Sequence, residues 1–339
     1  MALKQPKLLD IFRGVLFVLA CFVLFHVIAW LYYDVVPVGP RQCRRVVLFS
    51  MQRSGSGWLQ DTLSSHPRMW FDTEILVGKD KGRFYNFVAR EIEQSSWKSK
   101  HKRTKISRQW VTAFLDDYWN STLSRCLEHN VVCGFKLMYS QMRLFPTIWR
   151  YLRQQDVCII HLVRENILDI ELSDVRATST RIAHCRSKER TRCNVTAQRQ
   201  QSYKLNVDTL RRKLGVRLRA QQHARLDLRY NRLKTLEVHY ETLLHQQQEW
   251  LQSYNVSGDH VQHPFPVENG LARQDVQPPP KASEDDWCKL LLFLGQPCED
   301  RALLRSIHQK MITRPHRETI SNFDEVVKKL SRSRYNVYL

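Results

Sequence analysis

The chain has 339 residues and is strongly basic, with 53 Lys and Arg against 33 Asp and Glu and a formal net charge of +20 at pH 7. Its length allows one large domain or two small ones, and no internal repeat indicates a solenoid. None of its nine cysteines forms a C-x-x-C pair, so we expect no metal site of the structural zinc kind.

The first element along the chain is an apolar segment over residues 14–33, GVLFVLACFVLFHVIAWLYY, which contains no formally charged residue. About twenty such residues are enough to cross a bilayer core, so the segment predicts a single transmembrane helix. Lys4, Lys7 and Arg13 precede it. By the positive-inside rule they hold the N-terminus in the cytosol.

The predicted transmembrane helix separates a short N-terminal tail from the rest of the chain. We expect residues 1–13 to be a cytosolic tail, residues 34–44 a short stem, and residues 45–339 a lumenal domain. The chain is then a single-pass type II protein of the Golgi membrane. A lumenal domain does not meet DNA or RNA, which excludes nucleic acid as the partner of the basic surface.

Cysteines and glycosylation motifs both fit the secretory pathway. An oxidising compartment permits disulfides, and short sequence separations favour Cys185 with Cys193 and Cys288 with Cys298. Cys158 lies in a predicted core strand, so we expect it to be a buried thiol. The N-x-[ST] motifs are at Asn120, Asn194 and Asn255.

Strands alternate with helical stretches through the remaining chain. The predicted strands are 46–50, 131–137, 157–163 and 235–239. This alternation is typical of an α/β fold, with a P-loop-like parallel sheet flanked by helices, here preceded by the transmembrane helix. We expect a long basic helical insertion over 195–235 and an inserted loop over 252–286.

The strand at 46–50 runs into a small-residue loop, RSGSG over residues 53–57, followed by Trp58 and an apolar helical pattern. Backbone N–H groups at the start of a helix bind anions such as phosphate. A loop for nucleoside triphosphates needs a Lys after its last Gly, and Trp58 stands there instead. An ordinary Gly/Ser turn is the alternative explanation.

The order of residues in this loop resembles the 5′-phosphosulfate loop of sulfotransferases that use 3′-phosphoadenosine 5′-phosphosulfate (PAPS). A second match is the apolar strand VCIIHLV, which ends at Arg164 and is followed by a helical segment carrying Ser173. In the family such a pair binds the 3′-phosphate. The segments VCGFKLMY, LEVHYETLL and RPHRETISNFDEV resemble further family elements in the same order.

The resemblance implies that the chain transfers a sulfuryl group from PAPS, without a metal ion, to a hydroxyl acceptor. The favoured acceptor is a glycan, and a small glycolipid or a tyrosine remains open. A positive cleft would favour an anionic acceptor. The implied nucleotide ligands are Arg53, Ser54, Gly55, Ser56, Gly57, Trp58, Arg164, Ser173 and Arg317.

The resemblance also implies three catalytic groups. Arg53 would stabilise the leaving phosphate, Lys136 would add a cation near the sulfuryl group, and Glu74 would be the general base. Other branches of the family use histidine as the base, which makes His66 and His161 the alternatives.

Several of these residues also have an ordinary structural explanation. Arg164 and Lys136 could be surface residues at strand ends, and Glu74 could be an ion-pair partner or a charge near a helix start. Trp58 could be a core aromatic rather than a platform for adenine.

Two other functions remain open. A Golgi glycosyltransferase usually carries Asp-x-Asp, and only Asp72-Thr73-Glu74 and Asp169-Ile170-Glu171 come close to it here. A catalytically inactive, glycan-binding relative is favoured by Gly57, where the family usually has Ser or Thr. It is also favoured by the step from Arg164 to Ser173, which is one residue longer than usual.

Overall fold

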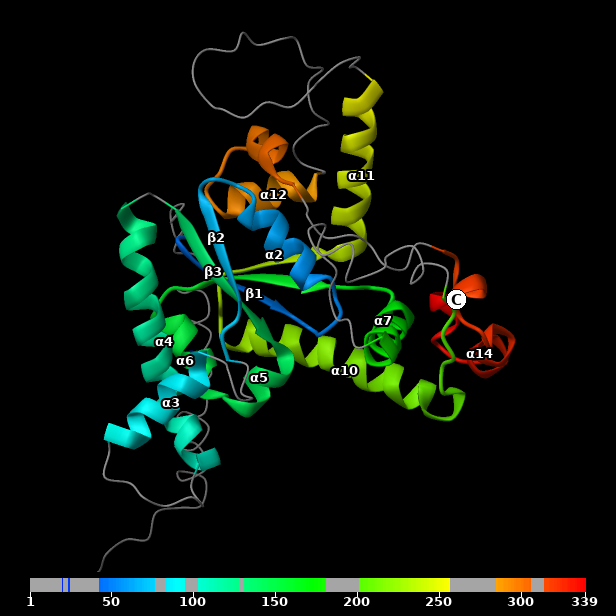
Figure 1. The fold of residues 1–339 in the computed structure, drawn as a ribbon, viewed down its shortest axis with the longest axis horizontal. Helices are drawn as coiled ribbons and strands as arrows, with labels where there is room; N and C mark the ends of the chain where they lie inside the picture. Colours follow the sequence, from blue (N-terminus) through cyan, green and yellow to red (C-terminus); the bar gives the residue numbers. More distant parts are fainter. Residues whose placement is uncertain are drawn as a thin grey trace, which may run out of the picture. The chain divides into compact units, whose positions relative to one another are not determined.

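The computed structural model describes residues 43–76, 83–94, 103–128, 131–180, 201–256, 285–305 and 314–339, together with Ala20 and Leu24 (Figure 1). The chain divides into two units, Met1–Gln42 and Cys43–Leu339. Of the first unit only Ala20 and Leu24 are described, and both are helical and exposed. The architecture below is that of the second unit.

The transmembrane helix expected over residues 14–33 is not supported. No helix in the described part of the chain is long and apolar enough to cross a membrane. The longest of them, α4 (Arg103–Glu128) and α10 (Val207–Tyr230), carry charged residues along their length, which a bilayer interior does not accept. Apart from Ala20 and Leu24, residues 14–33 lie outside the described residues, as do the predicted tail and most of the predicted stem.

A five-stranded sheet, parallel throughout, is the centre of the domain. Its strand order is β2-β3-β1-β4-β5. The strands are β1 (Arg45–Ser50), β2 (Met69–Glu74), β3 (Val132–Met138), β4 (Cys158–Val163) and β5 (Thr235–His239). The α/β parallel-sheet prediction is confirmed, and each of the four predicted strands lies within a residue or so of an observed one.

Helices connect the strands and cover the sheet. The shorter ones are α2 (Ser56–Ser64), α3 (Arg83–Gln94), α5 (Tyr139–Leu144), α6 (Thr147–Gln154), α7 (Ile167–Thr180), α11 (Tyr240–Val256), α12 (Asp286–Phe293), α13 (His316–Thr319) and α14 (Phe323–Leu330). Two 3₁₀ helices, η3 (Cys298–Leu303) and η4 (Asn336–Tyr338), complete the set that is described. The predicted basic helix is α10, whereas most of the predicted loop over 252–286 lies outside the described residues.

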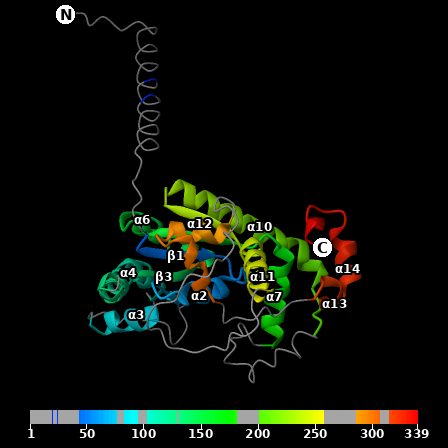
Figure 2. The same cartoon turned by 90° about the horizontal axis from the view of Figure 1, so that it is seen from above.

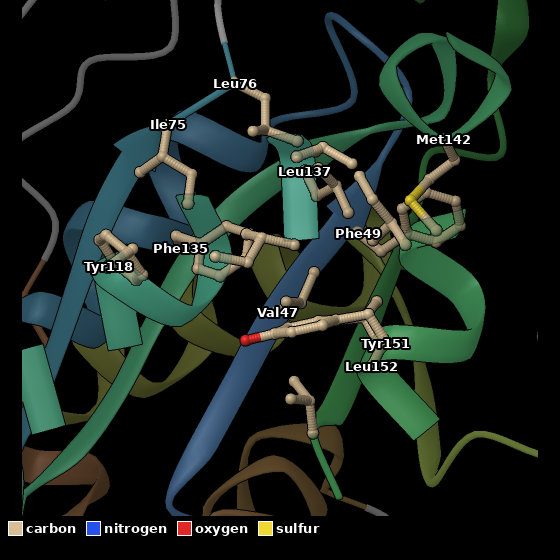
Figure 3. Close-up of a cluster of buried hydrophobic side chains, with 14 of the residues drawn as sticks. Val47, Phe49, Ile75, Leu76, Tyr118, Phe135, Leu137, Met142, Tyr151 and Leu152 are labelled. Atoms are coloured by element: carbon tan, nitrogen blue, oxygen red, sulfur yellow. The ribbon is translucent and has the colours of Figure 1, made fainter. Parts of the chain in front are cut away.

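Each face of the sheet has its own apolar core, because side chains alternate along a strand. On β1, Val47 and Phe49 point to the face covered by α4, α5, α6 and α10 (Figure 3). Val46 and Leu48 point to the opposite face, which α2, α11 and α12 cover. Burial on both faces explains why the central strands are continuous apolar runs.

A third cluster joins α7 to the N-terminal part of α10 and to α14, and includes Leu172, Leu214 and Val326. Figures 1 and 2 show these helices grouped at one end of the domain. The packing fixes α7 beside the carboxyl ends of the strands.

Three disulfides lie within the described residues. They are Cys43–Cys158, Cys126–Cys133 and Cys288–Cys298. The Cys288–Cys298 prediction is confirmed, whereas the prediction of a free thiol at Cys158 is wrong. Cys158 opens β4 beside β1, and Cys43 precedes β1, so their Cα atoms are only 5.7 Å apart. Cys185 and Cys193 lie outside the described residues.

The Cys43–Cys158 bond is expected to stabilise the fold most, because it spans 115 residues of sequence and long closed loops lose most entropy in the unfolded chain. Replacing both cysteines by Ala should lower the free energy of unfolding in urea by about 2–5 kcal/mol. The control is the Cys288→Ala, Cys298→Ala pair, which opens a span of 10 residues and should cost less. A larger loss in the control would contradict this order.

Candidate functional site

The strand order reverses between β1 and β4, and the region outside the carboxyl ends of these two strands is called the crevice below. From β1 the chain crosses to β2 and β3 on one side and later to β4 and β5 on the other. Ligands of open parallel sheets bind outside the carboxyl ends of the strands at such a reversal point. The loops that follow β1 and β4 meet there, since Arg164 Nη1 donates a hydrogen bond of 3.2 Å to the carbonyl oxygen of Arg53.

The loop after β1 has the backbone of an anion cradle. Arg53 has φ 66° and Gly55 has φ 88°, both in the left-handed region. The Ser54 hydroxyl donates to the Met51 carbonyl oxygen at 2.6 Å, which ties the loop down. Gly55 is the N-cap of α2 and no side chain caps that helix. The N–H groups of the first turn of α2 therefore remain available for a ligand.

Tyr240, the first residue of α11, fixes how closely this loop is packed. A Cβ at Gly55 would lie 2.3 Å from its ring, so only glycine fits there. The same ring lies 4.9 Å from Arg164 Cζ and meets Trp58 edge-on, with centroids 5.4 Å apart. Trp58 is half-buried and also contacts Trp287. Trp58 therefore belongs to an aromatic cluster beneath the loop, in line with its structural explanation.

Arg164 is buried, with 8% of its surface exposed. Its Nη2 donates to Asp169 Oδ2 at 2.8 Å. Its Nε is buried and makes no hydrogen bond within the described part of the chain; Glu241 Oε1 is 3.9 Å away. Burial of a guanidinium donor without a hydrogen bond is costly. This donor is therefore a position where an anionic ligand would find a partner.

Asp169 links Arg164 to the C-terminal segment. His316 Nε2 lies 2.7 Å from its Oδ1. Burial by itself would raise the pKa of Asp169, but hydrogen bonds from His316 and Arg164 and their charges hold it at about 2. The hydrogen bond to Asp169 raises the pKa of His316, against the opposing effect of burial. The pair therefore favours a charged carboxylate beside a charged imidazolium.

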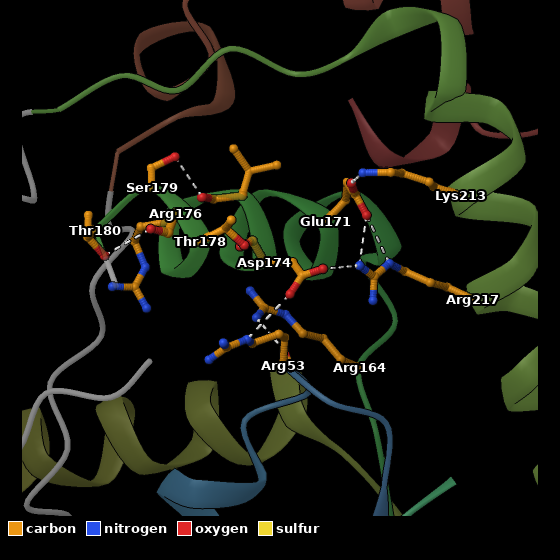
Figure 4. A network of polar contacts seen from close by, with 11 residues as sticks. Arg53, Arg164, Glu171, Asp174, Arg176, Thr178, Ser179, Thr180, Lys213 and Arg217 are labelled. Carbon is orange, nitrogen blue, oxygen red and sulfur yellow. Dashed lines mark hydrogen bonds and ion pairs between the residues drawn. The ribbon is translucent and has the colours of Figure 1, made fainter. Parts of the chain in front are cut away.

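A second chain of ion pairs holds Arg53 against α7 (Figure 4). Asp174 Oδ1 is 3.7 Å from Arg53 Nε, and its Oδ2 accepts from Arg217 Nη2 at 2.9 Å. Arg217 also donates to Glu171 Oε2 at 2.7 Å, and Lys213 reaches Oε1 of the same carboxylate. Asp174 thus lies between the Arg53 loop and α10.

Ser173 lies on α7, four residues after Asp169, so the two share a face of the helix. It is half-buried, while Leu172, one residue earlier, is fully buried in the third apolar cluster. A serine at position 172 would therefore face the core. The longer step from Arg164 to Ser173 places the hydroxyl on the side of α7 that carries Asp169.

Arg317 is exposed on α13 and stays a predicted nucleotide ligand. Its neighbour His316 contacts Asp169 and so brings the C-terminal segment to the site.

Glu74 and Lys136 face each other across neighbouring strands. They are in register on β2 and β3, and Lys136 Nζ lies 3.6 Å from Glu74 Oε1. Lys136 is buried, with 6% exposure, and the Glu74 side chain is 26% exposed. Glu74 ends β2, and Lys136 lies two residues before the end of β3. At the usual strand spacing Lys136 is about 5 Å and Glu74 about 10 Å sideways from β1. The ion-pair explanation for Glu74 is confirmed, and it does not exclude a role in proton transfer.

The two alternative bases are placed unfavourably. His66 follows α2, next to the amino end of β2, and its Nε2 contacts Asp300 Oδ2 at 3.1 Å. His161 lies within β4, fully buried, between Tyr139 and Glu237. Burial lowers the pKa of both histidines, although their carboxylate partners oppose it. His66 lies at the amino edge of the sheet. The His161 ring is one residue closer to the carboxyl edge than Lys136, but both of its nitrogens are held by Tyr139 and Glu237.

Sequence reasoning missed Asp169, His316 and Arg176 as residues of this site. In the sequence Asp169 stands out only as part of Asp169-Ile170-Glu171, which comes close to an Asp-x-Asp motif, and His316 lies beside the predicted ligand Arg317. Arg176 on α7 is 3% exposed. Burial lowers its pKa, Tyr203 raises it, and the charge of Arg53 lowers it further, which places a second guanidinium near the loop. The spacing along α7 could have indicated Asp169 and Arg176, whereas no signal in the sequence indicates His316, which lies on α13.

Within the described residues no group of three His, Cys, Asp or Glu side chains is arranged to hold a metal ion. No family model matches the chain, and no curated protein matches it either. The site must therefore be interpreted from its own geometry.

The His316–Asp169 contact should make stability depend on pH. The pKa of His316 is raised above 6.5 in the folded chain, so its stabilisation is complete below pH 6.5 and is lost as the pH rises through the folded value. The pKa of Asp169 is lowered to about 2, so its contribution is present above its ordinary pKa of 3.8 and is lost as the pH falls towards 2.

Substituting His316→Gln should lower the free energy of unfolding by about 1–2 kcal/mol below pH 6.5, with a smaller difference in alkaline buffer. Urea unfolding at several pH values measures this. The control is His245→Gln, because His245 pairs with Glu249 at an exposed position where ion pairs contribute little. Parallel pH profiles for wild type and His316→Gln would contradict the assignment.

Proposed function

We propose that this protein transfers a sulfuryl group from PAPS to a hydroxyl group of a glycan. The supporting observation is the meeting of two anion-binding features at one crevice. They are the uncapped N-terminus of α2 and the buried Arg164, whose Nε lacks a hydrogen bond within the described chain. A ligand with two separate phosphate groups fits such a pair of sites.

The residues divide between the two ends of such a nucleotide. The loop Ser54–Trp58 would bind the 5′-phosphosulfate through backbone N–H groups, and Arg53 would add its charge. Arg164 and Ser173, on the neighbouring side of the crevice, would bind the 3′-phosphate. Gly57 is buried in the first turn of α2, where it contributes its backbone N–H but no hydroxyl.

The chemistry at the reacting hydroxyl is assigned to the Lys136–Glu74 pair. Bound PAPS would supply the sulfuryl group. Glu74 would accept the proton of the acceptor hydroxyl as that oxygen attacks sulfur in line. Lys136 and Arg53 would stabilise the negative charge that builds up on the departing bisphosphate. The contact of 3.6 Å with Lys136 Nζ would hold the Glu74 carboxylate in position before substrate binds.

The disulfides bear on where this reaction would occur. Disulfides persist in oxidising compartments such as the secretory pathway, and three lie within the described residues. We therefore propose the lumen of the Golgi as the site of the reaction. Glycans abound there, and the chain's net charge of +20 would favour acidic ones by electrostatic attraction.

Binding of the reaction product, adenosine 3′,5′-bisphosphate, tests the nucleotide site. Calorimetry should give a dissociation constant near 1 μM, about −8 kcal/mol. Arg164→Ala should weaken binding by about 100-fold, because a charge-assisted hydrogen bond is lost. Arg164→Lys should recover only part of it, since lysine lacks the planar fork of donors.

The matched control is Arg150→Ala, which removes an exposed guanidinium from α6 and should leave the affinity unchanged. Melting curves of all variants report whether they are folded. A folded wild-type domain that does not bind the nucleotide would overturn the proposal.

Transfer activity tests the catalytic pair. With ³⁵S-labelled PAPS and desulfated heparan, chondroitin and keratan chains as acceptors, Glu74→Gln and Lys136→Met should each lower turnover by about 100-fold or more. Affinity for the bisphosphate should change little in Glu74→Gln. Glu249→Gln, at an exposed position on α11, is the control. Unchanged turnover in both variants would exclude the pair from the transfer step.

A further inference from the structure

A cavity of about 740 Å³ lies beside the edge strand β2, away from the crevice described above. Its walls come from β2, α3 and α4 and from the start of β3, and Figure 1 shows α3 and α4 on that side of the sheet. The volume is in the range of small-molecule sites.

This cavity is separate from the nucleotide crevice. Its wall includes Trp70, which pairs in register with Cys133 near the amino end of β3. The loop after β1 begins beyond Ser50, which pairs with Met138 at the other end of β3. Five residues of strand separate these levels, or roughly 16 Å. A ligand of the cavity would therefore not touch the Arg53 loop.

The charges around the cavity cancel. Arg83 Nη1 donates to Asp72 Oδ2 at 2.8 Å, and Arg90 Nη2 lies 3.8 Å from Asp117 Oδ2. Two arginines thus face two aspartates, whereas the whole chain carries +20. The electrostatic attraction of an anion to this cavity would be no stronger than its attraction to the basic surfaces elsewhere on the chain. The lining therefore favours a neutral ligand.

Aromatic and hydrogen-bonding groups are presented together in the lining. Trp70 is 53% exposed, an unusual position for an indole. Close to it, Asp72 Oδ2 accepts from both Arg83 and the buried Tyr118 hydroxyl, at 2.8 and 3.0 Å. Within the described residues, none donates to Asp72 Oδ1. This leaves an oriented carboxylate oxygen that can accept a hydrogen bond from a ligand.

We propose that the cavity binds a neutral saccharide unit. A pyranose ring has an apolar face of C–H groups, which would pack on the Trp70 indole, and a rim of hydroxyls. One hydroxyl would donate to Asp72 Oδ1, and Asn86 and Ser121 would bond others. The site does not depend on sulfuryl transfer, because it requires neither PAPS nor the crevice residues.

Fluorine NMR of protein labelled with 5-fluorotryptophan provides the test, with the Trp70 resonance assigned from a Trp70→Phe variant. The probes are methyl β-galactopyranoside, methyl α-mannopyranoside and N-acetylglucosamine. At least one should shift the Trp70 resonance, with a dissociation constant on the order of 1 mM for so small a ligand. Glucuronic acid and galactose 6-sulfate should bind more weakly than the neutral sugars.

Ligand-observed saturation transfer then compares variants. Trp70→Ala should weaken binding at least tenfold, and Trp70→Phe should weaken it less. Tyr230→Ala is the matched control, because Tyr230 is an aromatic residue 86% exposed on α10, and binding should be unchanged. Binding should also persist in Arg164→Ala, even if that variant or the wild type fails to bind the bisphosphate.

Three outcomes would overturn the proposal. They are no shift of Trp70 with any of the three neutral sugars, equal binding by Trp70→Ala and wild type, and tighter binding of the anionic sugars. Protection of β2 amides by an extended peptide, without sugar binding, would likewise reassign the edge strand to a protein partner.

Discussion

The burial of a single guanidinium, that of Arg164, is the constraint around which the crevice is built. A buried charge without partners is strongly destabilising, so several parts of the chain must supply contacts to it. Asp169 comes from α7, the Tyr240 ring from the start of α11, and the Arg53 carbonyl oxygen from the loop after β1. Arg53, Arg164 and Tyr240 follow β1, β4 and β5 in turn. The contacts of the Arg164 guanidinium therefore hold these three segments together.

The cations of this crevice are already paired with carboxylates. Arg164 contacts Asp169, Arg53 contacts Asp174, and Lys136 contacts Glu74.

An anionic ligand must therefore compete with these internal carboxylates. A ligand with one phosphate can replace only one of these contacts, whereas a ligand with several anionic groups can replace several of them at once. Such a site discriminates by the number and spacing of charges, and its affinity should fall steeply with salt.

The central strands could be predicted from the sequence, because β1, β3 and β4 are buried on both faces and read as continuous apolar runs. The edge strand β2 could not. Its sequence MWFDTE mixes polar and apolar residues since one side chain in two faces solvent or the cavity. The meeting of Arg53 and Arg164 followed from the parallel order of the strands, because Arg164 comes directly after β4 and Arg53 comes three residues after the end of β1.

The remaining contacts depend on which distant segments pack together. Nothing near Asp169 in the sequence indicates His316, and the pairing of Cys43 with Cys158 depends on the register of β1 with β4. The prediction for Cys158 was wrong because it assumed that a buried strand residue has only apolar neighbours. The chain that leads into β1 passes beside Cys158, and it carries Cys43. The transmembrane prediction rested on composition alone, and the described helices do not support it.

The Cys43–Cys158 bond also determines how mechanical force would enter the domain. It joins Cys43, two residues before the start of β1, to the first residue of β4, and these two strands pair side by side. Tension along the polypeptide from residues before Cys43 would be shared between both strands instead of peeling β1 from its neighbours. Because the disulfide joins β1 and β4 at their amino ends, the two strands would move together under this tension. The crevice at their carboxyl ends would then keep its width while the chain is pulled.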